Sequence, residues 1–290
     1  MINQKIQMDR HQIPKILNFS ATDPSGGAGM NADIMTQTSL GCYPLSVVTG
    51  VTVQDTNGVD YVSPIDAEIV NDQARKILKD SDIDVIKCGL LCSTENIVML
   101  SQITADYPQI PVILDPIITS GMGDQLSTQD MLESMINLLF PKATLITPNI
   151  NEARILSSFN QKNKQTIDVD QIALRLMATG CQNILITGGD DITKSIVNRF
   201  YNSQNKNEPK IFHWERIPGS FHGTGCTLAS SIAVFVAQGF SIGDAAQEAQ
   251  QYTWDTLRFA FQSGKGQMTP NRFYWMFNES DEGNDEPQHH

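Results

Sequence analysis

The segment Gly223-Thr224-Gly225-Cys226 carries residue types that phosphate binding requires. Small and apolar residues from Leu228 to Ala237 predict a helix directly behind it, ending at Gly239. A glycine turn that opens into a helix aims unpaired N–H groups and the positive end of the helix dipole at one point, which is an anion site. The same dipole would favour a thiolate at Cys226. The turn therefore predicts a phosphate site with a candidate base built into it.

The same residues also have ordinary interpretations. A glycine before a helix is often only a tight loop, and a cysteine at a helix start is often only a small buried hydrophobic residue. Two standard nucleotide fingerprints are absent from the sequence. Leu228 stands where the dinucleotide pattern requires glycine, and no Lys-Ser/Thr pair follows a matching glycine as in a phosphate-binding loop. If the protein binds a nucleotide, it does so in another fold.

The elements that would position this turn alternate along the chain. Strands are predicted at 16–20, 45–53, 84–91, 112–115, 144–147 and 183–187, and helices at 30–40, 66–78, 94–103, 131–140, 152–157, 172–179 and 242–259. Residues 195–201 and 210–214 predict a hairpin across the polar loop 202–209. The continuous β-branched run 45–53 indicates a buried strand. This alternation predicts an α/β fold in which a mostly parallel sheet has helices on both faces.

The sequence predicts one domain over residues 15–278, because it contains no internal repeat and no interior linker. Residues 1–14 are polar and unpatterned, which predicts a leader that packs little. Residues 279–290 contain five acidic residues and little apolar content, which predicts a disordered tail.

Composition limits the classes of partner. The 290 residues, 40% of them apolar, are enough for a sizeable core. A formal net charge of −12 argues against nucleic acid or an anionic membrane as partner, because both require a basic face. No apolar run approaches the roughly 18 residues that span a bilayer, and the first residues lack the apolar core of a signal peptide. The five cysteines are scattered without zinc-site spacing. We therefore expect a cytoplasmic protein that binds a small molecule.

Polar residues and glycines follow five of the predicted strands. They are Asp23, Gln54, Asp115, Asn149 with Glu152, and Gly188-Gly189. Because ligands gather beyond the carboxyl ends of the strands in such a sheet, we expect these residues to form one site. Each alone is also explained as a helix cap or a turn former, and for Asp23 or Asn149 alone that is the better explanation. The joint pattern favours a site.

Four segments resemble the hydroxymethylpyrimidine/phosphomethylpyrimidine kinases, a family of the ribokinase-like superfamily. They are 23–29 (Asp-Pro-Ser-Gly-Gly-Ala-Gly), Asp115-Pro116, Thr147-Pro148-Asn149 with Glu152, and 222–228 (His-Gly-Thr-Gly-Cys-Thr-Leu), in the family's order and spacing. The resemblance covers about residues 15–262. It implies the three-layer ribokinase-like fold and MgATP as phosphoryl donor. It also implies phosphorylation of 4-amino-5-hydroxymethyl-2-methylpyrimidine and then of its monophosphate, for thiamine biosynthesis, and we expect a homodimer.

The resemblance also assigns roles to residues of this sequence. The anion hole maps onto Gly223, Thr224, Gly225 and Cys226, with Cys226 as the base; the pyrimidine pocket onto Ala21, Asp23, Ala28, Thr52, Gln54 and Leu90; the nucleotide side onto Asn149, Thr187, Gly188 and Gly189; and Mg²⁺ onto Asp115 and Glu152. These residue types suit the chemistry. Phosphoryl transfer needs dipoles or positive charge around the moving group, and Mg²⁺ keeps several waters and so needs few protein ligands. The amide of Gln54 offers a donor and an acceptor to an aminopyrimidine.

Three residues depart from the family's usual pattern. Ala21 replaces a glycine, Leu90 a methionine and Thr187 a lysine. The first two narrow or reshape the pyrimidine pocket, and the third touches the nucleotide side. Two alternatives follow. One is a pyridoxal-type kinase, whose substrate also offers a hydroxymethyl group on an aza-aromatic ring. The other is a non-catalytic ligand sensor, which the retained Gly-Thr-Gly-Cys turn and Glu152 disfavour.

Overall fold

The computed structural model describes residues 13–159, 167–189 and 195–276. The predicted acidic tail lies outside these residues, as does the predicted leader apart from residues 13 and 14. The division into leader, domain and tail therefore stays a prediction.

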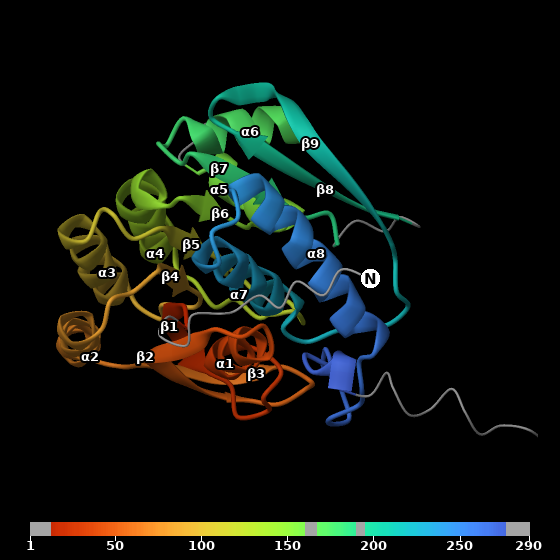
Figure 1. Cartoon of the computed structure of the whole chain (residues 1–290), viewed down its shortest axis with the longest axis horizontal. Helices are drawn as coiled ribbons and strands as arrows, with labels where there is room; N and C mark the ends of the chain where they lie inside the picture. Colours follow the sequence, from red (N-terminus) through yellow and green to blue (C-terminus); the bar gives the residue numbers. More distant parts are fainter. Residues whose placement is uncertain (1–12, 160–166, 190–194, 277–290) are drawn as a thin grey trace, which may run out of the picture.

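The described strands form one nine-stranded sheet in the order β3-β2-β1-β4-β5-β6-β7-β8-β9 (Figure 1). Their bounds are β1 Lys15–Thr22, β2 Tyr43–Gln54, β3 Val59–Pro64, β4 Val85–Cys88, β5 Val112–Leu114, β6 Leu145–Ile146, β7 Asn183–Ile186, β8 Ser195–Asn202 and β9 Asn205–Glu215. Six neighbouring strands pair in parallel, in the order β2-β1-β4-β5-β6-β7. Among the described strands, antiparallel pairs occur only at the two edges of the sheet, β2–β3 and β7–β8–β9. The predicted mostly parallel sheet is confirmed.

Helices cover both faces of the sheet and complete three layers (Figure 1). One face carries α1 (Gly29–Ser39), α7 (Thr224–Ala237) and α8 (Ile242–Arg258), and the other carries α2 (Ala67–Asp80), α3 (Thr94–Asp106), α4 (Gln129–Ser134), α5 (Ile150–Ser157) and α6 (Val169–Met177). Alternate residues of one strand serve the two cores. Ile16 packs in the core under α7 and α8, and Leu17 packs in the core under α2 to α6.

The observed elements differ from the predicted ones at the two edges of the sheet and after α4. β3 was not predicted; it pairs with β2 to form a two-stranded ribbon at the edge of the sheet. Val51 and Val53 of this ribbon are exposed, so the prediction that the strand 45–53 is buried is wrong at these two residues. The predicted loop 202–209 shrinks because β9 begins at residue 205. The predicted helix 131–140 is α4 followed by a π-helix over Met135–Leu139 and a 3-10 turn over Phe140–Lys142, where Pro141 cannot continue α-helical hydrogen bonding.

The sheet has a topological switch point beside β1. After β1 the chain enters α1 on one face, whereas after β4, the neighbour of β1, it enters α3 on the other face. The carboxyl ends of these strands therefore diverge, and in open α/β sheets ligands bind in the resulting crevice. Asp23 follows β1 and Leu90 follows β4, so two predicted site residues flank the switch point.

Candidate active site

The start of α7 lacks the side-chain cap that most helices here possess. Side chains of Asp66, Ser93, Thr128, Asn149, Asp168 and Ser241 accept backbone N–H groups at the starts of α2, α3, α4, α5, α6 and α8. The N-cap residue of α7 is Gly223, with φ +86° and no capping side chain. Its first N–H groups, from the predicted anion hole, therefore point past the helix end without a side-chain acceptor. This geometry suits an anionic ligand.

A second glycine turn packs directly on the first. A Cβ atom on Gly223 would lie 1.9 Å from the carbonyl oxygen of Gly27, and one on Gly27 would lie 2.2 Å from the His222 ring. Glycine is therefore required at both positions by close approach. Residues 23–29 and 222–226, far apart in sequence, form one double turn at the carboxyl edge of the sheet.

Asp23 holds this double turn together. Its carboxylate accepts hydrogen bonds from the Ser25 N–H and hydroxyl, from the Ala28 N–H, and from Nε2 of His222 at 2.9 Å. Although burial opposes it, the hydrogen bonds from His222, Ser25 and Ala28 lower the pKa of Asp23 below its ordinary value. The carboxylate is fully buried and its bonds go to the protein. The prediction that Asp23 binds substrate is untested, and its observed contacts are those of a positioning residue.

The predicted thiolate at Cys226 is contradicted. Burial raises the pKa of the Cys226 thiol to about 12, and Asp115 adds to the rise, while Lys87 and a hydrogen bond from the Gly29 N–H oppose it. The helix dipole alone led to the opposite expectation. Desolvation outweighs it because the side chain is buried at the meeting of α1, α7 and the sheet. Cys226 is nevertheless in the first turn of α7, as predicted.

A buried ion pair lies beneath this turn. Nζ of Lys87 in β4 donates to Asp33 of α1 at 2.7 Å, and Ser230 of α7 donates to the same oxygen at 2.6 Å. Both charged side chains are fully buried. Although burial opposes it, Asp33 raises the pKa of Lys87, so the ammonium stays charged. The pair ties α1, α7 and β4 together under the double turn.

The predicted metal residues follow two neighbouring strands of the sheet, β5 and β6. Asp115 follows β5, and an oxygen of its carboxylate lies 3.6 Å from where a Gly225 Cβ would be. Burial raises the pKa of Asp115 to about 6, while Lys87 and a hydrogen bond from Thr147 oppose the rise. Glu152 belongs to the first turn of α5, and its two carboxylate oxygens accept the N–H groups of Ile118 and Asn149.

Asn149 and Glu152 form a capping box at the start of α5. The Asn149 side chain accepts the N–H groups of Asn151 and Glu152, and Glu152 returns the bond to the Asn149 backbone. The helix-cap interpretation of Asn149 is therefore correct as a description of its contacts. The predicted nucleotide role is untested and would be additional to the cap.

The remaining nucleotide-side residues lie at the end of β7. Thr187 pairs with Asn149 as an isolated bridge, and the Gly188 N–H donates to Asn198. The carbonyl of Gly189 accepts a hydrogen bond from Arg216. A Cβ on Gly188 would lie 2.5 Å from a carbonyl oxygen of β8, so glycine at this position allows the two backbones to approach closely.

The predicted pyrimidine residues lie on the β1, β2 and β4 side of the double turn. Thr52 donates to the Thr22 carbonyl, and the Gln54 amide donates one of its two N–H groups to Thr52 at 2.6 Å. Ala21 and Leu90 are buried, and Ala28 precedes α1. The structure thus brings the predicted residues together along one edge, while their contacts with substrate are untested.

Residues 23–271 match the phosphomethylpyrimidine kinase family. The chain belongs to this family. Among curated relatives of the phosphomethylpyrimidine kinase family, the thiamine biosynthesis bifunctional protein ThiED of Geobacter sulfurreducens is 33% identical over 254 residues, which is 87% of this chain and 50% of that protein. The hydroxymethylpyrimidine/phosphomethylpyrimidine kinase of Mycobacterium bovis is 32% identical over 262 residues, 87% of this chain and 91% of that protein. The chain thus spans about half the length of the bifunctional relatives and nearly all of the mycobacterial one.

Solved structures support the same fold. A phosphomethylpyrimidine kinase of Clostridium difficile superposes with a TM-score of 0.70 at 28% identity, covering 83% of this chain and 98% of that one. An ADP complex of Bacillus subtilis pyridoxal kinase gives a TM-score of 0.82 at 24% identity, covering 92% of this chain and all of that one. The predicted ribokinase-like three-layer architecture is confirmed.

Sequence reasoning missed three groups beside this candidate site. The position of Lys87 inside the apolar run Val85-Ile86-Lys87-Cys88 was a signal for a buried charge. The residues around its partner Asp33 contain no such signal. Arg272, buried beside the double turn, follows no recognisable pattern.

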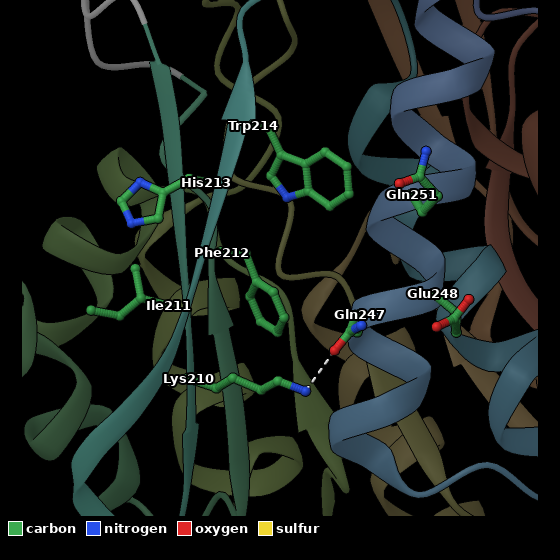
Figure 2. A pocket seen from close by; sticks show the side chains of 8 residues that line it. All are labelled: Lys210, Ile211, Phe212, His213, Trp214, Gln247, Glu248 and Gln251. Atoms are coloured by element: carbon green, nitrogen blue, oxygen red, sulfur yellow. Dashed lines mark hydrogen bonds between the residues drawn. The ribbon is translucent and has the colours of Figure 1, made fainter.

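A surface groove of about 420 Å³ lies elsewhere, between β9 and α8 (Figure 2). Figure 2 shows Lys210 reaching from the strand to Gln247 on the helix, and the two are hydrogen bonded at 2.6 Å. None of the predicted site residues lines this groove. Among the helices of the described segments, none has the length and apolar composition needed to cross a membrane.

Proposed function

We propose that the protein phosphorylates 4-amino-5-hydroxymethyl-2-methylpyrimidine with ATP and then phosphorylates the monophosphate to the diphosphate, for thiamine biosynthesis. The observation that carries this proposal is the uncapped start of α7 at Gly223, packed against a second glycine turn at the switch point of the sheet. Family membership supports it, as does the name of a relative that matches along 91% of its length.

The chain's own groups suit phosphoryl transfer to such an alcohol. The N–H groups of Gly223 to Cys226 would stabilise the negative charge on the moving phosphoryl group. Asp23 keeps residues 23–28 folded against these donors through Ser25, Ala28 and His222. Gln54, Thr52 and Leu90 would orient the pyrimidine ring. Cys226 is our candidate base because of its position in the anion hole. Its raised pKa favours the competing role, in which the side chain only shapes the anion hole, and a variant at this position distinguishes the two roles.

The residues present fit MgATP. In the described part of the chain no cluster of three or more His, Cys, Asp and Glu side chains could hold a metal, so a Mg²⁺ ion would depend on two carboxylates and water. Asp115 and Glu152 are hard oxygen donors that follow the adjacent strands β5 and β6, which matches that requirement. Asn149, Thr187, Gly188 and Gly189 would line the nucleotide side. MgATP supplies the γ-phosphoryl group and the cation that spreads its charge.

The deciding experiment is a coupled ADP-release assay on the purified protein. The pyrimidine alcohol, its monophosphate and pyridoxal are supplied separately, with and without Mg²⁺. We expect turnover of both pyrimidines, dependent on Mg²⁺. Turnover of pyridoxal alone would replace the proposal by the pyridoxal-type kinase, and ligand binding without turnover of any of the three would indicate a sensor.

We further propose a homodimer formed through the β2–β3 ribbon. Val51, Val53 and Tyr61 are exposed there, and Val53 lies directly opposite Tyr61 in the antiparallel register. Exposed apolar side chains gathered on one sheet face are typical of protein interfaces. Sedimentation equilibrium should give a dimer for the wild type and a monomer for Tyr61→Lys. Ile69→Lys, at an exposed apolar position on α2, is the control. A cytoplasmic location stays a prediction.

A further inference from the structure

The segment after α8 folds back over the double turn. Figure 1 shows it beside α1 and β3. Met268 exchanges backbone hydrogen bonds with Ser220 and His222, immediately before the anion-hole turn. The Arg272 carbonyl accepts the hydroxyl of Tyr252 of α8 at 2.9 Å. The backbone of Arg272 is thereby fixed, and its side chain points inward, only 2% exposed.

The guanidinium of Arg272 contacts both glycine turns. One Nη donates to the Gly27 carbonyl, the group against which Gly223 packs, and the other reaches the Gly26 carbonyl at 3.5 Å. Nε donates to the hydroxyl of Thr227 at 3.1 Å. That hydroxyl in turn donates to the Gly223 carbonyl at 2.8 Å. Arg272 therefore links the two halves of the double turn through a continuous set of hydrogen bonds.

The charge of Arg272 is not neutralised at close range. Lys87, the other buried cation of the site, pairs with Asp33 at 2.7 Å. No carboxylate of the described residues lies within ion-pair distance of the Arg272 guanidinium, whose contacts are carbonyls and a hydroxyl. Burial lowers the pKa of Arg272, and longer-range attraction to the carboxylates of Asp33 and Asp23 opposes this. Burying an unpaired charge is costly, so its retention here is explained if an anion occupies the neighbouring turn.

We propose that Arg272 is a positioning residue for phosphoryl transfer: through Gly27 and Thr227 it fixes the spacing of the two glycine turns, and its charge strengthens anion binding at the start of α7. This inference rests on the proposed function for the identity of the anion, a phosphoryl group. It assigns the segment after α8 a part in the kinase site.

The test uses the full chain with Arg272→Gln, Arg272→Lys and the control Arg75→Gln. Arg75 lies on α2 at the surface, paired with Asp106, so its replacement removes the same charge away from the site. The measurements are kcat and KM for the pyrimidine alcohol and its monophosphate, the Kd of ADP by calorimetry, and Tm. We expect Arg272→Gln to raise the Kd of ADP by about tenfold or more and to lower kcat by a similar factor. This is the scale of one hydrogen bond to a charged group. Arg272→Lys should keep the ADP Kd within about threefold, because the charge remains, while kcat falls because the fork of donors is lost.

Two results would overturn the proposal. One is wild-type kcat and ADP Kd in folded Arg272→Gln, whatever its Tm, because a purely structural role moves Tm alone. The other is an equal change in ADP affinity in Arg75→Gln. If Arg272→Gln does not fold, Thr227→Val and Thr227→Ser decide, since only valine removes the hydroxyl between Arg272 and Gly223. A lowered kcat in Thr227→Val together with wild-type kcat in Thr227→Ser supports the proposal, and wild-type kcat in both variants overturns it.

Failure of the proposed function gives a different result. In that case the wild type releases no ADP with either pyrimidine, yet the Kd of ADP and of inorganic phosphate still reports the anion site. Weaker binding in Arg272→Gln than in Arg272→Lys then supports the Arg272 assignment, and equal binding overturns it.

Discussion

Replacing Gly223 by alanine tests the double turn most directly. Gly223 has φ +86°, where an L-residue costs about 1–2 kcal/mol. Its new Cβ would also lie 1.9 Å from the Gly27 carbonyl oxygen, and such contacts essentially never fall below 3.0 Å. The two turns must therefore separate by about an ångström. Because a misplacement of about 1 Å can cost about 10²-fold in rate, we expect kcat/KM to fall by about that factor.

Gly41→Ala separates strain from displacement. Gly41 has φ +85°, nearly identical to that of Gly223, but nothing lies within 4 Å of its Cβ position. This control should lose the same 1–2 kcal/mol, lowering Tm by about 2–4 °C per kcal/mol, and keep full activity. ADP release and thermal unfolding are measured on both variants. If Gly223→Ala matches Gly41→Ala in kcat/KM, the packing of the two turns has no part in catalysis and the reasoning is refuted.

Four further predictions concern single side chains. Cys226→Ala should cut phosphorylation of the alcohol by about 10²–10⁴-fold more than that of the already ionised monophosphate, if Cys226 is the base; equal losses in kcat/KM would leave it only a shaping role. Glu152→Gln should raise the Mg²⁺ concentration needed for half-maximal ADP release, and an unchanged Mg²⁺ titration would contradict its metal role. The pKa of Asp23 is lowered on folding, so its ionised form contributes stability above the ordinary carboxyl pKa of about 4, and this stability is lost as pH falls through the folded value. Asp23→Asn should accordingly lower Tm at pH 7, with a difference from wild type that shrinks below pH 4; a constant difference would show that ionisation is irrelevant. Lys87→Met should cost about 3–5 kcal/mol in urea titrations by leaving Asp33 unpaired, and Lys87→Met with Asp33→Leu should regain most of it; a double variant no better than the single one would argue against the pair.

The sequence was sufficient for features that depend on local patterns. The alternation of strands and helices predicted the parallel sheet, and strand ends such as those at Asp23, Asp115 and Asn149 therefore had to meet at one edge. The uncapped start of α7 followed from glycine chemistry at Gly223. These inferences needed only the periodicity of apolar residues and the residues that terminate helices.

Features that depend on tertiary contacts escaped prediction. The pKa of Cys226 is set by burial and by charges from β4 and the end of β5, which no local pattern places beside α7. Arg272 contacts Gly27 across 245 positions of sequence, so its role is invisible without the fold. β3 was missed because its six residues end in a proline and lie half-exposed at the sheet edge, where apolar patterning is weak.

The closure of the double turn by residues 266–272 has a consequence for the order in which the protein becomes active. A ribosome releases β1, the loop at 23–29 and every strand of the sheet before it releases Arg272. A nascent chain can therefore build its hydrophobic layers while the bonds from Arg272 to Gly27 and from Gln267 to Thr56 are still missing. Closing contacts across such sequence separations is slow compared with local folding. The double turn should thus reach its final geometry later than the hydrophobic layers do during synthesis.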